Sequence, residues 1–248
     1  SCDPLQTFCF WINSTMARIR SEQEYQAKRE AYLKAAWQLL LNEGFDALSV
    51  NRLIEYTESS KGAFYHYFTS KDQVIEAVID WALHISLAEL QDGIAGSSND
   101  ERTPIRIINQ FLGGMPDRPS YTIRLRRLLL EVRRAGNEPL VQLLTDRTIE
   151  ICSPWLETVI REGKKKGYFN TKWPAETAEL VLLASKSAFL NAADLLLAGP
   201  EVENRVEKLR DSYNATCDLC ERLLGVKERT LSRLKLKDAR VIAESTSW

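Results

Sequence analysis

One stretch of the chain, Ser49–Phe68, carries side chains suited to contact with a nucleic acid; it reads SVNRLIEYTESSKGAFYHYF. The segment that begins at Lys61 is expected to present one face with a cation, two small residues and two hydrogen-bonding rings. Small residues leave room beside base edges, while a cation and polar rings can donate to bases or phosphates. A helix that enters the DNA major groove needs such a face. It consists of Lys61, Gly62, Ala63, Tyr65 and His66.

Two short helices joined by a tight turn must position this face. Ser49 stands just before the first helix, where its hydroxyl can cap the first turn. Glu58 and Ser59 interrupt the helical pattern, and Ser60 is placed to cap a second helix that starts at Lys61. The first helix has one buried face with the i, i+3, i+4, i+7 spacing: Val50, Leu53, Ile54 and Thr57.

The aromatic residues of the second helix have two possible roles. Phe64 and Phe68 are expected to be core anchors, and Tyr65 could simply join that cluster. We favour phosphate contact for Tyr65, because helical spacing puts it on the opposite face. Lys71 could be an ordinary solvated lysine, but it lies beside a helix N-terminus, where backbone N–H groups also attract phosphate. We therefore include Lys71 in the candidate set.

Composition limits the range of functions. The chain has 248 residues, is 44% hydrophobic and has a formal net charge of -1. It is long enough for two modest domains or one large one. Residues 16–76 contain eight Lys plus Arg against nine Asp plus Glu, so any DNA footprint must be local. We find no nucleophile motif and no cluster of residues with the spacing of metal ligands. We therefore do not expect an enzyme, a cofactor or a metal site.

The five cysteines have no framework spacing, which fits a reducing, cytoplasmic location. Cys217 and Cys220 form a C-x-x-C pair, but both fall in an apolar helical stripe, which favours core packing over redox or metal chemistry. The longest apolar run, residues 180–197, contains Lys186 and Asp194. We therefore expect no membrane partner.

The spacing predicts an all-α protein. The first helix is expected to start between Ser21 and Tyr25 and to end at Glu43. Four regions follow from composition and periodicity: an N-terminal arm over residues 1–24, a helix-turn-helix domain over 25–72 with its motif at 49–68, a larger helical domain over 73–225, and a tail over 226–248. The arm is expected to be disordered, and Met16 is either the natural start or part of an ordinary arm. The tail is either a short docked helix or a frayed end. Helices of the larger domain are expected over 104–112, 121–134, 139–166, 174–198 and 201–224.

Several motifs together resemble the TetR/AcrR-type transcriptional regulators. They are GFDALSV and SKGAFYHYFTSKDQVIEAV, within a match from roughly Arg29 to Val78, and GYFNTKWPAETA further on. The resemblance implies an all-helical homodimeric repressor with an N-terminal three-helix DNA-binding domain. It also implies a larger ligand-binding and dimerisation domain, a palindromic double-stranded operator and release by a small-molecule inducer.

The resemblance also implies roles for single residues. Ser49 matches a hydroxyl that contacts phosphate, and Lys71 matches a backbone clamp at the start of the fourth helix. The turn departs from the family pattern: Thr57, Glu58 and Ser59 stand where Ala, Gly and an aliphatic residue are usual. Glu58 is therefore expected at positive φ. The complete DNA-contact set is Ser49, Ser60, Lys61, Gly62, Ala63, Tyr65, His66 and Lys71.

In this family the last two long helices pair with their copies, which predicts a homodimer through residues 174–198 and 201–224. The alternative is a large monomeric core. One helical stripe, which includes Ala178, Val181, Leu182, Ser185, Ala188 and Phe189, is the expected contact face. The unknown inducer is expected among large side chains that could also be plain core: Trp81, Phe111, Leu128, Trp155 and Phe189.

Two functions remain open on the sequence. The first is a ligand-responsive repressor that binds DNA. The second is a helical dimeric scaffold that serves mainly protein partnership and binds DNA weakly or not at all. Glu58 and the acid-balanced N-terminal region favour the second slightly, whereas SKGAFYHYF and Lys71 favour the first strongly.

Overall fold

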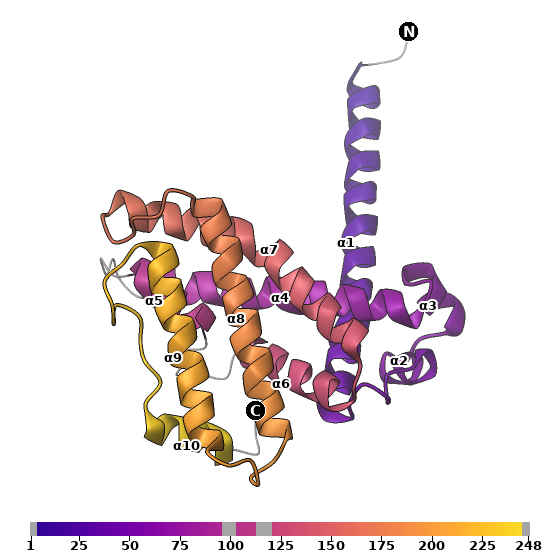
Figure 1. Ribbon diagram of the computed structural model, residues 1–248. Helices are drawn as coiled ribbons and strands as arrows, with labels where there is room; N and C mark the ends of the chain where they lie inside the picture. The colour runs from indigo at the N-terminus through magenta and orange to yellow at the C-terminus, as the bar shows by residue number, and fades with distance from the viewer. Residues whose placement is uncertain (1–3, 96–102, 113–120, 245–248) are drawn as a thin grey trace. The chain divides into compact units, whose positions relative to one another are not determined.

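The computed structural model describes residues 4–95, 103–112 and 121–244, and this part of the chain contains ten α-helices and no strand (Figure 1). The predicted all-α class is confirmed. The chain forms two compact units, residues 1–78 and 79–248. Residues 1–3 of the expected arm and 245–248 of the tail lie outside the described residues.

The first unit contains α1 (Pro4–Asn42), α2 (Val50–Tyr56), α3 (Lys61–Tyr67) and the start of α4 (Lys71–Ala95). The prediction for α1 was wrong at its N-terminus, because the helix begins at Pro4 and includes residues 4–24. Proline suits a first helical turn, and neither glycine nor a second proline interrupts the sequence before Asn42. The helix ends where expected, just before Gly44 at φ +86°.

A small aromatic core holds the first unit together. Trp37 of α1 and Phe64 of α3 are almost fully buried, as is Phe68 directly after α3. The Tyr32 ring lies edge-on to the rings of Phe64 and Phe68, with centroid distances of 5.6 Å and 6.0 Å. Leu53 of α2 is also fully buried. These contacts fix α2 and α3 against α1, which is the condition for a rigid presented face.

The second unit contains the rest of α4 and six further helices. α7, α8 and α9 share one continuous core, which α5 joins. Cys152, Cys217 and Cys220 are buried within it, in agreement with the core interpretation of the C-x-x-C pair. The helices are α5 (Thr103–Leu112), α6 (Tyr121–Arg134), α7 (Glu138–Lys165), α8 (Pro174–Leu197), α9 (Arg205–Leu224) and α10 (Leu236–Glu244).

The tail after Gly225 is a docked element and not a frayed end. α10 packs on α9 through a small cluster that contains Leu209, Ala239 and Ile242 (Figure 1). Glu221 holds the connecting segment: its buried carboxylate accepts hydrogen bonds from the backbone N–H of Leu231 at 2.7 Å and of Arg229 at 3.1 Å. Arg233 Nη2 donates to the same carboxylate at 2.7 Å.

α8 exposes a different face from the expected one. Ala178, Val181 and Leu182 of the predicted contact stripe are buried within the unit, whereas Leu180 and Leu183 are 46% and 38% exposed. Leu190 and Leu197 lie near the helical face of these two leucines and are half-buried, so part of this apolar face is exposed. α8 is also the one described helix long and apolar enough to cross a membrane by length and composition.

The charges of α8 connect it to its neighbours. Arg133 of α6 donates to Asp194 at 2.8 Å and also pairs with Glu138. Lys186 lies 3.6 Å from Asp146 of α7. The two charged side chains within the apolar part of α8 are thus both paired with side chains of neighbouring helices.

Candidate DNA-contacting surface and ligand cavity

Two serines cap the helices of the helix-turn-helix. Ser49 Oγ accepts a hydrogen bond from the backbone N–H of Arg52 at 3.2 Å, at the start of α2. Ser60 Oγ accepts from the backbone N–H of Ala63 at 3.1 Å, at the start of α3. Both predicted caps are confirmed. A capping hydroxyl keeps its own hydrogen, so each serine can still donate to a phosphate.

The turn between α2 and α3 is held by hydroxyl groups. Glu58 adopts φ 48°, as expected from the missing glycine. Thr57 Oγ1 donates to the Leu53 carbonyl at 2.7 Å, and Ser59 Oγ lies 2.9 Å from Thr57 Oγ1. Tyr32 Oη of α1 donates to Ser59 Oγ at 2.7 Å. This network is not predictable from the local sequence: polar side chains stabilise a turn that glycine usually makes.

α3 presents the predicted face. Lys61, Gly62 and His66 are exposed and Ala63 is half-buried, while Tyr65 is 48% exposed. A side chain built on Gly62 would meet nothing closer than the Ser60 hydroxyl at 4.0 Å, so this part of the helix surface is open. Phe64 and Phe68 are buried, which confirms them as core anchors. The exposed face is small at its N-terminal end and polar beyond it.

Ring contacts hold two of the candidate side chains, His66 on this face and Lys71 beyond it. The ring of His66 lies against those of Tyr25 and Tyr67, with centroids 5.6 Å and 5.0 Å away. Lys71 begins α4, and its ammonium lies 4.9 Å from the centroid of the Phe45 ring. This cation–π contact holds the lysine at the N-terminus of α4, where backbone N–H groups also point outward.

The local cations differ in their partners. Arg52 is held by Glu43, which accepts two hydrogen bonds at 2.7 Å and 2.8 Å, and by Glu55 at 3.2 Å. These bonds satisfy much of its guanidinium within the protein. Lys61 and Lys71 form no ion pair with the described residues. They are therefore the cations of this surface best placed to meet an external anion.

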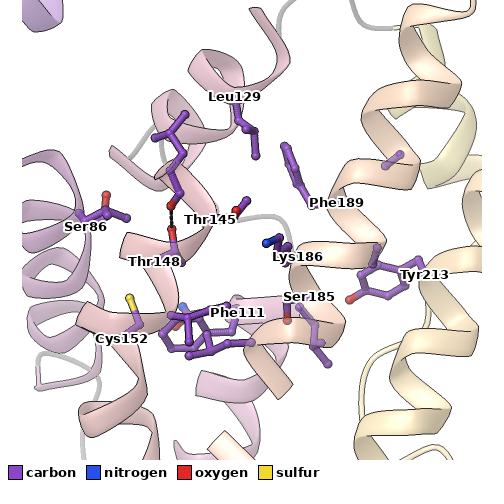
Figure 2. Close-up of a pocket in the computed structure, with 18 of the residues that line it drawn as sticks. Ser86, Phe111, Leu129, Thr145, Thr148, Cys152, Ser185, Lys186, Phe189 and Tyr213 are labelled. Atoms are coloured by element: carbon purple, nitrogen blue, oxygen red, sulfur yellow. Dashed lines mark hydrogen bonds between the residues drawn. The ribbon is translucent and has the colours of Figure 1, made fainter. Parts of the chain in front are cut away.

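The second unit contains a cavity of about 220 Å³. Side chains from α4, α5, α6, α7, α8, α9 and α10 line it, and most of them are apolar (Figure 2). Of the predicted lining residues, Phe111 and Phe189 line the cavity. Trp155 lies behind Phe111, with ring centroids 5.6 Å apart. Trp81 and Leu128 are not among the lining residues, and Leu128 is buried in the core.

Sequence reasoning missed the polar lining. Ser86, Thr145, Thr148, Ser185 and Lys186 all contribute to the cavity wall (Figure 2). Lys186 was read only as a charge that interrupts an apolar run; a lone lysine inside such a helix is itself a signal of a partner or a site.

One thiol, that of Cys152, also lines the cavity. Its burial raises the pKa of the thiol to about 12, so it is uncharged near neutral pH and a weak nucleophile. The described residues contain no group of three or more His, Cys, Asp or Glu side chains able to hold a metal ion.

Comparison with known proteins agrees with this arrangement. The family model described as "Bacterial regulatory proteins, tetR family" matches residues 33–78. The chain is 24% identical over 211 residues to the HTH-type transcriptional repressor BepR of Brucella suis biovar 1, a match that covers 79% of this chain and 98% of that protein.

Two solved structures are similar in fold. A TetR-family transcriptional regulator from Pectobacterium atrosepticum has a TM-score of 0.61 and 21% identity, over 84% of this chain and 98% of that one. RolR in complex with resorcinol has a TM-score of 0.55 and 15% identity, over 90% of this chain and 96% of that one.

The described residues combine a capped helix-turn-helix, an exposed face on α3 and a second helical unit with a cavity, an arrangement expected of a ligand-responsive regulator. Residues 33–78 match the tetR family of bacterial regulatory proteins, and the chain as a whole is similar in sequence to a helix-turn-helix repressor and in fold to a TetR-family regulator.

Proposed function

We propose that the protein is a repressor that binds a palindromic operator as a homodimer and is released by a small molecule. The exposed face of α3 is the observation that carries this proposal. Lys61, Gly62 and Ala63 would face the bases, because Gly62 and Ala63 are small enough to permit close approach and Lys61 can donate hydrogen bonds. Ser49, Ser60, Tyr65, His66 and Lys71 would contact phosphates.

The dimer would form through α8 and α9. Leu180 and Leu183 of α8 and Leu219 of α9 are exposed to 46%, 38% and 49%. A stripe of exposed leucines is costly in water and typical of an interaction surface. This face replaces the stripe with Ala188 that the sequence suggested, since Ala188 lines the cavity. Two copies related by a two-fold axis would present two α3 helices, which requires an inverted-repeat operator with half-sites about 34–36 Å apart or a multiple of it.

The cavity is the proposed inducer site. It is largely apolar and has a few polar groups, as small-molecule sites usually are. The relative of similar fold, RolR, was solved with resorcinol, a single-ring molecule. We further propose a cytoplasmic location, because the operator is there and the charges of α8 are paired with α6 and α7.

α4 is the proposed link between inducer and operator. It is one continuous helix that begins at Lys71, and Leu83, Ser86, Leu87 and Leu90 of the same helix line the cavity. A ligand that favours one position of α4 over another would shift the phosphate clamp with it. The shift is limited by the difference in ligand affinity between the two states.

The alternative function, a dimeric scaffold for protein partners, has one supporting observation, the carboxylate of Glu58 beside the recognition helix. An electrophoretic mobility shift with the DNA upstream of its own gene separates the two. The repressor predicts a shifted band that survives excess non-specific DNA. A band that disappears with non-specific competitor would favour the scaffold.

A further inference from the structure

The serine and threonine hydroxyl groups that line the cavity differ in what they can offer a ligand. A serine or threonine hydroxyl has one hydrogen to donate. Thr148 Oγ1 donates to the Leu144 carbonyl at 2.7 Å, and Ser185 Oγ donates to the Val181 carbonyl at 2.8 Å. Thr145 Oγ1 likewise donates to carbonyls of its own helix. These three groups therefore turn only acceptor lone pairs toward the cavity.

Ser86 is different. It is 6% exposed, lines the cavity from α4, and its Oγ has no hydrogen-bond partner among the described residues. A buried hydroxyl without a partner is energetically unfavourable, because it has lost its hydrogen bonds to water. A ligand atom that accepts a hydrogen bond would recover this energy. Figure 2 shows Ser86 well apart from Lys186, with Thr148 drawn between them.

Lys186 is the only charged residue among the described residues that line the cavity. Its Nζ lies 3.6 Å from Asp146 Oδ1, longer than the ~2.7–2.9 Å of a charge-assisted hydrogen bond. Asp146 is 57% exposed and also accepts two hydrogen bonds from Gln142, at 2.7 Å and 2.8 Å. The carboxylate is thus shared with solvent and Gln142, and the ammonium keeps donors for a second anion.

The size of the cavity limits the ligand to about one ring. A cavity of about 150 Å³ accommodates benzene, and this one measures about 220 Å³. Phe111 and Phe189 contribute their rings to its wall (Figure 2). Aromatic rings pack well against aromatic ligands in offset or edge-on geometry. The apolar volume therefore suits a single substituted aromatic ring.

We propose that the inducer is a monocyclic aromatic carboxylate whose carboxylate binds Lys186 and whose ring packs against Phe111 and Phe189. A ring substituent with an acceptor oxygen would take the hydrogen bond of Ser86. This inference rests on the proposed function, in which the cavity is the inducer site.

The first test compares two ligands of equal shape by isothermal titration calorimetry of the full chain at pH 7. Benzoate is expected to bind about tenfold more tightly than neutral benzamide, since a hydrogen bond between two charged groups is stronger than one to a neutral amide. In Lys186→Met this preference is expected to disappear. Equal affinity of the wild type for the two ligands, or a preference that persists in Lys186→Met, would overturn the proposal.

Asp146→Asn is the matched control, because it removes the same ion pair and keeps the ammonium. The affinity of benzoate for this variant should equal or exceed its affinity for the wild-type protein. A loss as large as that of Lys186→Met would mean that the ion pair and not the free ammonium governs binding, against the proposal. For the second contact, Ser86→Ala should abolish any gain of the best-binding hydroxybenzoate isomer over benzoate; a gain that remains would refute the Ser86 contact.

A DNA measurement separates this inference from the proposed function. If wild type binds operator DNA and a second ligand class releases it while benzoates do not bind, the ligand class is wrong and the repressor stands. If benzoates bind with the Lys186 dependence above but do not release DNA, the ligand class stands and ligand-responsive repression is wrong.

Discussion

Tyr32 Oη donates a hydrogen bond to Ser59 Oγ at 2.7 Å and so ties α1 to the turn of the helix-turn-helix. Thr57 uses its only hydroxyl hydrogen on the Leu53 carbonyl, so Ser59 must be the donor in the 2.9 Å contact between Ser59 and Thr57. The hydrogen bonds therefore all run in one direction, from α1 through the turn to the end of α2. This network places the start of α3.

The Tyr32→Phe variant tests this network. Loss of the phenolic hydroxyl should lower the free energy of unfolding by about 1 kcal/mol, because one partly buried hydrogen bond is lost and the ring contacts remain. Thermal unfolding followed by circular dichroism measures the effect. Tyr56→Phe, at a position 53% exposed, makes the same chemical change and should leave Tm unaltered. Equal Tm values for both variants would show that the network adds no stability.

Lys71→Ala tests phosphate contact at the start of α4. The variant should bind all DNA sequences more weakly, and the slope of log affinity against log salt should fall by about one unit. Fluorescence anisotropy at several salt concentrations provides the slope. Lys172→Ala removes an exposed lysine of the second unit and serves as the control. A wild-type slope in Lys71→Ala would remove this residue from the contact set.

Leu183→Glu tests the proposed dimer face. A charge within the exposed leucine stripe of α8 should produce monomers in sedimentation velocity, because a buried unpaired carboxylate is costly. Operator affinity should then fall steeply, since each half-site is bound alone. Thr158→Glu adds the same charge on an exposed position of α7 and should remain dimeric. A dimeric Leu183→Glu protein would place the interface elsewhere.

Glu221→Gln tests the attachment of the tail. Burial alone would raise the pKa of Glu221, but hydrogen bonds from Leu231, Arg233 and Arg229 outweigh it, and the net pKa is lowered from 4.5. A lowered folded-state pKa stabilises the protein above the unfolded value, and that stability is lost as the pH falls through the folded value. The variant should be less stable than wild type by about 2 kcal/mol at pH 7, and the difference should shrink below pH 4.5.

Urea unfolding at pH 7 and at acidic pH measures this dependence. Asp218→Asn is the control. It removes the other carboxylate partner of Arg233, and the Asp218 side chain is 55% exposed. Its effect should be smaller, since exposed ion pairs contribute little. If Glu221→Gln lowers the free energy of unfolding by the same amount at both pH values, the ionised carboxylate is not the cause of the effect.

Local rules predicted most of the candidate surface around α3. Capping by Ser49 and Ser60, burial of Phe64 and Phe68, and positive φ at Glu58 all depend on a few neighbouring residues, and the structure has each of them. The hydroxyl network was not predictable in the same way. It requires Tyr32, 27 positions away from Ser59, and only the packing of α1 brings the two together.

The cavity was predictable only in part, for a geometric reason. A large side chain in a helical domain can either pack in the core or line a cavity. The rotation of its helix about the helix axis determines which of the two it does. Phe111 and Phe189 face the cavity, whereas Trp155 lies behind Phe111. The same rotation places Ala188 at the cavity wall and leaves Leu183 exposed, so the proposed dimer contact is assigned to Leu183 and not to Ala188.

The most direct test of the account is the affinity of Ala63→Leu for a DNA duplex that the wild-type protein selects from random sequence. Ala63 lies at the N-terminal end of the exposed face of α3, where a leucine would collide with base edges. The account predicts a loss of specific affinity of more than about tenfold, with circular dichroism and sedimentation unchanged. Wild-type affinity in this variant would mean that α3 does not enter the groove.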